Sequence, residues 1–139
     1  MSTEEFVSVL IVDQVREDKG IIANASFVLG LTAGRMLSDS TFGHDMVDGE
    51  GSHHAYLTNI GHMVRKAGQN KMRELRKKFF EAGIVKVIDY TEDAAPADYA
   101  TYASALASHK GEEITYRALY VYGPATLIIP LTKNLSRLS

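Results

Sequence analysis

Two polar residues follow a predicted strand at a position where α/β proteins bind ligands. Asp89 and Thr91 stand at the end of the apolar run 84–89 and just past it. Open α/β sheets hold ligands in the crevice outside the carboxyl ends of their strands. Asn24, in the first turn of a predicted helix, could offer its amide to the same crevice, where backbone N–H groups favour an anion. The alternatives are structural: Asp89 caps or hydrogen-bonds a neighbouring loop, and Asn24 is a polar residue held against the first strand.

A glycine-rich loop gathers imidazole and carboxylate groups. They belong to His44, Asp45, Asp48, Glu50, His53 and His54. Such groups are ligands for a divalent ion of the zinc, nickel or manganese kind. No pair of them has the helical spacing that would fix a coordination geometry, and the same residues fit a solvated polar loop. We therefore assign no metal and no cofactor.

A basic stretch surrounds the second predicted helix. It consists of Lys66, Lys71, Arg73, Arg76, Lys77 and Lys78. Basic side chains bind the phosphates of nucleic acids, but Glu74 and Glu81 interrupt this stretch, and no aromatic residue is interleaved to stack on bases. A solvated amphipathic face is the preferred interpretation, so we do not expect tRNA to be a partner.

The composition is typical of a soluble globular protein with one domain. The chain has 139 residues, of which 45% are hydrophobic and 23% charged, enough for one core. A net charge of -2 gives no overall attraction to nucleic acid or anionic lipid, and the absence of cysteine excludes disulfides and thiolate chemistry. The apolar run 6–12 is too short for a signal core or a membrane span. We expect a cytoplasmic protein that does not enter membranes.

Apolar patterns predict strands that alternate with helices. Strands are expected at 6–12, 56–65, 84–89 and 114–122, and helices at 20–37, at 71–82 and from about Pro96 to near Gly111, with a long loop at 38–55. This order indicates an α/β layered domain with a largely buried, mixed sheet. Apolar residues surround the axis of the helix at 20–37, so that helix should be buried on more than one side. We predict that the second side meets a partner subunit, which would make a homodimer. The alternative is that the long loop that follows covers it.

The C-terminal part of the chain resembles a known fold. An aromatic-rich strand stops at Gly123 and Pro124 and passes into a short helical turn, as in the closing segment of the type II peptidyl-tRNA hydrolase fold. With Ala23-Asn24-Ala25 near a helix start, Glu81-Ala82-Gly83 at a helix end and a strand ending at Asp89, the chain is similar to an uncharacterised bacterial family, domain-of-unknown-function family 2000. The resemblance implies a three-layer α/β/α fold with a four-stranded mixed sheet, forming one domain over residues 1–139.

The hydrolase motif itself is broken in this chain. Hydrolases of that fold carry Gly-Lys at a strand-to-helix junction, and placing Gly20 on the motif glycine puts Ile21 where the lysine belongs. Lys19 precedes the glycine and could reach the same space from another direction. Asp89 matches the aspartate at the end of the third strand. Losing the ammonium while keeping the carboxylate does not preserve the same electrostatic catalysis.

The sequence therefore predicts a protein that binds a small anionic ligand or a partner. The expected crevice lies between Asp89, the loop at 43–54 and the Gly123-Pro124 turn. Its predicted ligand-binding residues are Lys19, Asn24, Thr91 and Gly123.

The alternative is an enzyme that hydrolyses an aminoacyl or peptidyl ester or amide, including residual peptidyl-tRNA hydrolase activity. Asp89 would be the acid or base, assisted by His53 or His44. A loop histidine within hydrogen-bond reach of Asp89 would favour the enzyme, and histidines that point to solvent would favour the binding protein.

Overall fold

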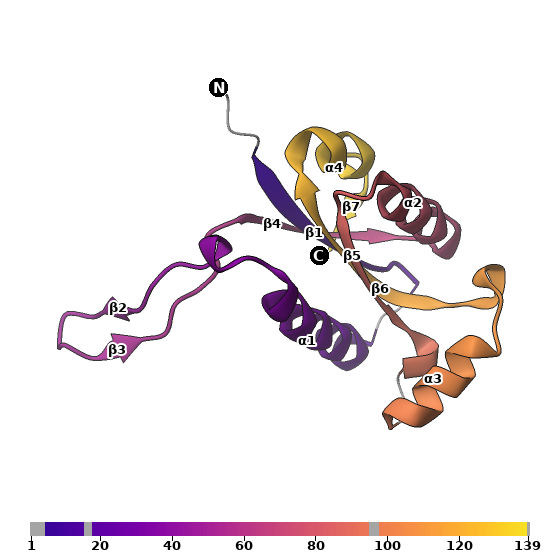
Figure 1. Cartoon of the computed structure of the whole chain (residues 1–139), viewed down its shortest axis with the longest axis horizontal. Helices are drawn as coiled ribbons and strands as arrows, with labels where there is room; N and C mark the ends of the chain where they lie inside the picture. Colours follow the sequence, from indigo (N-terminus) through magenta and orange to yellow (C-terminus); the bar gives the residue numbers. More distant parts are fainter. Residues whose placement is uncertain (1–4, 16–17, 95–97, 139) are drawn as a thin grey trace.

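The first strand, β1 (Phe6–Asp13), lies at the centre of the main sheet because its side chains are apolar on both faces. The computed structural model describes residues 5–15, 18–94 and 98–138. β1 pairs in parallel with β4 (Gly61–Ala67) and antiparallel with β6 (Tyr116–Pro124). β5 (Lys86–Thr91) pairs antiparallel with β6. The expected mixed α/β fold is confirmed (Figure 1).

The main sheet has five strands, so the prediction of four was wrong. The additional strand is β7 (Ser136–Arg137), which pairs antiparallel with β4 at the edge and completes the order β5-β6-β1-β4-β7. Two residues are too few to show a period in the sequence, and this strand is defined only by its contact with β4.

Both faces of the sheet bury apolar side chains. The helices α2 (Gln69–Ala82) and α4 (Ala125–Thr132) pack with Val7, Val9 and Ile11 in one core cluster. Leu10 and Val12 point to the other face, where they pack with α1 (Lys19–Met36).

The amphipathic pattern of α2 was predicted correctly. Met72, Leu75 and Phe79 are fully buried at helical spacing. The helix ends at Gly83, whose positive φ of 76° suits a glycine C-cap. It begins two residues before the predicted start at 71, because the backbone of Gly68 already accepts from Met72 N–H.

The remaining predicted helix is α3 (Tyr99–Ala107), which begins after the N-cap Asp98. Pro96, the expected helix start, lies outside the described residues. Short 3-10 turns flank this region: η2 (Glu92–Ala94) follows β5 and η3 (Gly111–Glu113) precedes β6. Among the described residues, the structure contains no helix with the length and apolarity needed to cross a membrane.

The segment between α1 and β4 forms a projecting hairpin. It leaves α1 through η1 (Asp39–Thr41), folds back on itself through β2 (Met46–Val47) and β3 (His53–His54), and points away from the sheet (Figure 1). We call residues 43–57 the arm, and all of them are exposed. The strand predicted at 56–65 therefore starts later, as β4, because residues 56 and 57 belong to the arm.

The arm does not cover the outer side of α1. Ala25, Leu29 and Ala33 are buried on the inner side, whereas Phe27 is 68% exposed and Leu31 64% exposed. The alternative in which the following loop covers the second side of this helix is therefore not what the structure shows.

Candidate functional site

A serine, a histidine and a tyrosine from three neighbouring strands meet on the α1 face of the sheet. Ser8 of β1 stands beside His62 of β4 in the parallel register, and its Oγ lies 2.7 Å from His62 Nδ1. Tyr120 of β6 lies near enough to Ser8 for the serine side chain to lower the pKa of its phenol. Ser8 is only 1% exposed. An apolar strand has thus buried a hydroxyl, a cost that its contacts with His62 Nδ1 and with the backbone oxygen of Gly61 offset.

Burial also affects the tyrosine of this cluster. Its removal from water raises the pKa of Tyr120 above the ordinary value, and the side chain of Ser8 lowers that pKa by a smaller amount. The phenol therefore keeps its proton at neutral pH and can donate a hydrogen bond. In the pair with His62, Ser8 donates when Nδ1 is unprotonated and accepts when Nδ1 carries the proton.

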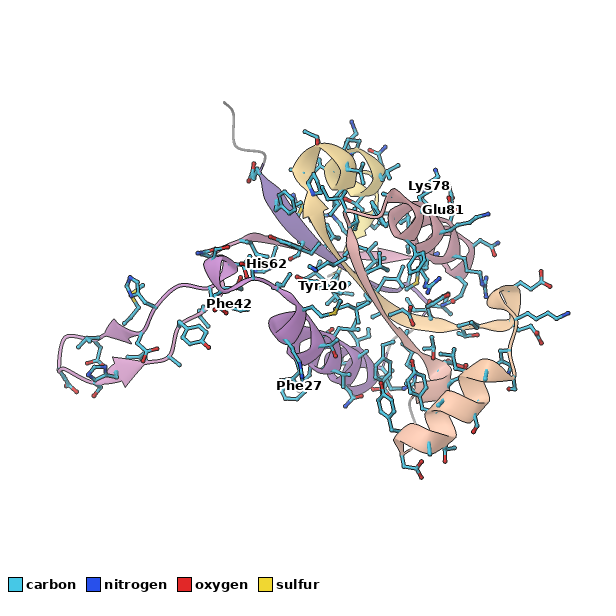
Figure 2. The ribbon with its side chains drawn as sticks, viewed as in Figure 1. Phe27, Phe42, His62, Lys78, Glu81 and Tyr120 are labelled. Atoms are coloured by element: carbon cyan, nitrogen blue, oxygen red, sulfur yellow. The ribbon has the colours of Figure 1, made fainter. Side chains whose placement is uncertain are left out.

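The cluster lies at a cavity of about 270 Å³ between α1 and the sheet. Figure 2 shows His62 and Tyr120 between the strands and α1, with Phe42 at the root of the arm. The apolar walls come from both the sheet and α1, and their main side chains are Leu10, Leu29, Ala33, Leu37, Phe42, Met63 and Val64.

Two further hydroxyls line the cavity, those of Ser26 and Thr58. They donate to the backbone oxygens of Ile22 and Thr41 at 2.8 Å each, so their own protons are engaged. Gly30 and Gly34 of α1 form part of the rim, and a Cβ at either position would meet nothing within 4 Å. The cavity therefore combines apolar walls, one polar cluster and an open side along the helix.

Asp89, the predicted acid, is held in an ion pair. Its Oδ2 lies 2.9 Å from Arg76 Nε of α2, and the two side chains are 19% and 36% exposed. The adjacent residue Tyr90 donates from its hydroxyl to Asn24 Oδ1 at 3.2 Å. A groove of about 350 Å³ lies here between α1, β5 and α3, but these polar groups at its edge already have partners in the fold.

The other predicted binding residues are spread over the sheet. Lys19 is exposed at the start of α1. Thr91 is 1% exposed, and its hydroxyl has no hydrogen-bond partner in the described part of the chain. Gly123 lies near the opposite end of β5, because Thr91 pairs with Tyr116 whereas Lys86 pairs with Tyr122.

Gly123 has a packing role in this position. A Cβ on it would lie 3.0 Å from Val85 Cγ2 and 3.3 Å from Val85 Cα. The structure brings Asn24 to the strand that ends at Thr91, but it does not bring Gly123 there.

The histidine loop is far from Asp89 as well. His53 lies in β3 of the arm, which points away from β5 (Figure 1). His54 Nε2 lies 2.7 Å from Asp48 Oδ2, and this bond, with backbone hydrogen bonds from the turn, lowers the pKa of Asp48. His44 Nδ1 contacts the backbone oxygen of Asp45 at 3.0 Å. Within the described ranges, no three histidine or acidic side chains are placed to hold a metal ion.

Part of the basic stretch is paired within the fold. Glu74 Oε1 lies 3.0 Å from Lys78 Nζ, and Glu74 Oε2 lies 3.6 Å from Lys71 Nζ. Arg73 donates to the backbone oxygen of Ile114 at 2.9 Å, and Arg76 pairs with Asp89. Two carboxylates, Glu74 and Asp89, thus offset part of the positive charge that could attract phosphates.

Sequence reasoning did not single out Ser8, His62 or Tyr120. Ser8 was visible as one hydroxyl within an apolar strand, and Tyr120 as one of three tyrosines near the C-terminus. Neither residue type is unusual in a strand. Ser8 and His62 are 54 residues apart in the chain, and the register between the strands brings them together.

Comparison with known proteins agrees with this fold. The model of a family described as "Protein of unknown function (DUF2000)" matches residues 8–138. The search of curated proteins gives no match. A solved structure of a protein of unknown function from Agrobacterium tumefaciens strain C58 is similar with a TM-score of 0.81 and 13% identity, covering 99% of this chain and 100% of that one. At this identity the likeness concerns the fold alone.

Proposed function

This chain belongs to the DUF2000 family, and we propose that it binds a small, mainly apolar molecule with an anionic oxygen in the cavity beneath α1. One observation carries the proposal. The hydroxyl of Ser8, a residue that is 1% exposed, lies 2.7 Å from the imidazole of His62, and both residues line an otherwise apolar cavity together with the phenol of Tyr120. A few convergent polar groups in an apolar pocket are typical of small-molecule sites.

The size of the cavity limits the ligand. Its volume of about 270 Å³ lies just below the roughly 300–1,000 Å³ of drug-sized sites. A cavity of ~150 Å³ is enough for benzene. A single ring with a short substituent, or a branched chain of similar volume, therefore fits the space.

The charge of the lining limits the ligand further. Among the lining residues that the structure describes, His62 is the one that can become positive, and none carries a carboxylate. Tyr120 adds a phenol that stays protonated at neutral pH. An acidic oxygen such as a carboxylate would receive charge-assisted hydrogen bonds from these groups.

A panel of one-ring and branched carboxylic acids, each with its neutral primary amide, tests this proposal. Binding is followed by ligand-observed NMR and by the shift in Tm. We expect the acids to bind more tightly than the amides. Tyr120→Phe and Ser8→Ala should each weaken binding roughly 10- to 100-fold, the value of one hydrogen bond to a charged group.

The controls are changes at the residues expected from the sequence. Asp89→Ala and His53→Ala should leave the affinity unchanged, since neither lines the cavity. Binding that survives Ser8→Ala and Tyr120→Phe but is lost in Asp89→Ala would reject the cavity and restore the crevice at the end of β5.

A second candidate function is hydrolysis of an aminoacyl or peptidyl ester or amide. The observation that favours it is the distance of 2.7 Å between Ser8 Oγ and His62 Nδ1, the contact of a nucleophile with a general base. Ser8 Oγ would attack the carbonyl carbon while its proton passes to Nδ1. The leaving group would take that proton, and water would then hydrolyse the acyl-serine. Tyr120 would donate to the carbonyl oxygen.

Acyl-enzyme trapping separates this enzyme from a simple binding protein. If the protein is such an enzyme, p-nitrophenyl acetate should give a burst of p-nitrophenol and add the mass of an acetyl group to Ser8. Both signals should be absent in Ser8→Ala and His62→Gln. His53→Ala and Asp89→Ala are the matched controls. If the wild type gives no burst, the binding function is the one that remains. A burst that is lost only in His53→Ala and Asp89→Ala would favour these two residues as the catalytic ones.

The proposal also includes the fold subclass, the cellular location and the absence of tRNA as a partner. The segments that resemble type II peptidyl-tRNA hydrolases support a three-layer, single-domain fold of that kind, in a bacterial, cytoplasmic protein. The ion pairs of α2 support the expectation that tRNA is not a partner. Binding of tRNA in a filter assay at physiological salt would contradict this part.

A further inference from the structure

We propose that a second copy of this chain covers the outer side of α1 with its arm, and that the exchange is reciprocal. The proposal does not rest on the ligand cavity. It follows from two exposed apolar surfaces in one chain, from their opposite charges and from their matching lengths.

The arm is an ordered hairpin that has no core of its own. Gly43 N–H donates to Leu57 O at 2.8 Å near its root, and Asp48 N–H donates to Ser52 O at 3.0 Å near its tip. Its apolar side chains are nevertheless in solvent, with Leu57 81% exposed and Met46 and Val47 59% exposed each. An isolated two-stranded hairpin is marginally stable in water, so a surface that packs against it is expected.

The outer side of α1 supplies such a surface. Phe27 and Leu31 are one helical turn apart and are 68% and 64% exposed. Figure 2 shows Phe27 pointing away from the sheet. The chain's own arm does not reach these residues, because it leaves the end of α1 and points away from it (Figure 1).

Charge selects a second copy as the occupant. The arm carries Asp45, Asp48 and Glu50 and no lysine or arginine. α1 carries Lys19 and Arg35 and no carboxylate. An acidic arm and a basic helix attract one another, and each copy presents both surfaces.

The lengths of the two elements also agree. Seven residues on each side of the hairpin reach about 23 Å at ~3.3 Å per residue, and the 18 residues of α1 span about 27 Å at ~1.5 Å per residue. A two-fold axis would place each arm along the partner's helix and would bury both pairs of surfaces at once.

Sedimentation equilibrium of the full chain is the first test. The proposal predicts a dimer with twice the 15.3 kDa mass of one chain. Phe27→Glu and Leu57→Glu should each raise the dimer dissociation constant by at least about tenfold, because each substitution acts twice in a two-fold dimer. Phe80→Glu is the matched control, since Phe80 is 64% exposed but lies on α2, and it should leave the dimer unchanged.

A cross-linking test identifies the contact itself. The chain has no cysteine, so a Phe27→Cys protein and a Leu57→Cys protein of different tag length can be mixed and oxidised. We expect the mixed disulfide to form preferentially, and a Phe80→Cys partner to form none. A monomer throughout, a dimer insensitive to Phe27→Glu and Leu57→Glu, or no mixed disulfide would each overturn the proposal. Capture of a different protein by the exposed surfaces of a monomer would do the same.

Discussion

Replacing Gly30 with alanine should stabilise the protein and constrict its cavity. Gly30 lies in the interior of α1, where glycine costs about 0.8–1.0 kcal/mol relative to alanine. A Cβ there would meet nothing within 4 Å, so no steric strain subtracts from the gain. The free energy of unfolding should rise by about 1 kcal/mol, or roughly 3–5 °C in Tm for a domain of this size.

Urea denaturation followed by circular dichroism measures this change. Gly123→Ala is the matched control, in which the free energy of unfolding should fall. Its new Cβ would lie 3.0 Å from Val85 Cγ2, and overpacking of this kind costs about 1–3 kcal/mol. A loss of stability in Gly30→Ala would refute the reasoning, because it would mean that the space beside the helix is filled.

The same position connects stability to binding. Gly30 is on the rim of the cavity, so a leucine there would project into the space that the ligand occupies. Gly30→Leu should fold but lose affinity for the carboxylic acids of the panel. Affinity equal to the wild type in this variant would place the ligand elsewhere.

Three further predictions concern the core, the buried tyrosine and the ion pair. Phe79→Ala should lower the free energy of unfolding by about 3–5 kcal/mol in urea because the ring is fully buried, whereas Phe80→Ala, at a ring that is 64% exposed, should cost less than about 1 kcal/mol. Burial raises the pKa of Tyr120, so the unfolded chain loses this proton at a lower pH than the folded chain. The contribution of Tyr120 to the free energy of unfolding should be complete below about pH 10 and should fall as pH rises above it. Tyr120→Phe should reduce that fall in urea titrations between about pH 8 and 11. A double-mutant cycle of Arg76→Ala and Asp89→Ala should give a coupling energy of roughly 1 kcal/mol. A coupling energy of zero would show that the ion pair does not stabilise the fold.

The elements with a clear local pattern were predictable from the sequence. Phe79 lies on the buried face of α2 as its spacing indicated, and the strand ending near Asp89 forms as expected. The patterns work because burial of one helix face or one strand is decided within a few residues. β7 and the arm have no such pattern, since pairing with β4 and a hairpin turn define them.

The candidate site was less predictable because it depends on contacts between distant residues. Asp89 was predicted to end its strand, but β5 continues to Thr91. Its partner Arg76 comes from the preceding helix and occupies the carboxylate. Ser8 became notable only through its neighbours His62 and Tyr120, which the strand order brings to it. The order of strands in the sheet could not be predicted from the local patterns of this sequence.

Intermolecular NOEs would locate the bound acid on the protein. The protein would be labelled at its methyl groups and titrated with the carboxylic acid that shifts Tm most. If the acid binds beneath α1, its protons should give NOEs to the methyls of Leu10, Ala33 and Val64, which line that cavity and not the groove beside β5. NOEs instead to the methyls of Val28, Ile88 and Ala94, which line the groove beside β5, would contradict binding beneath α1.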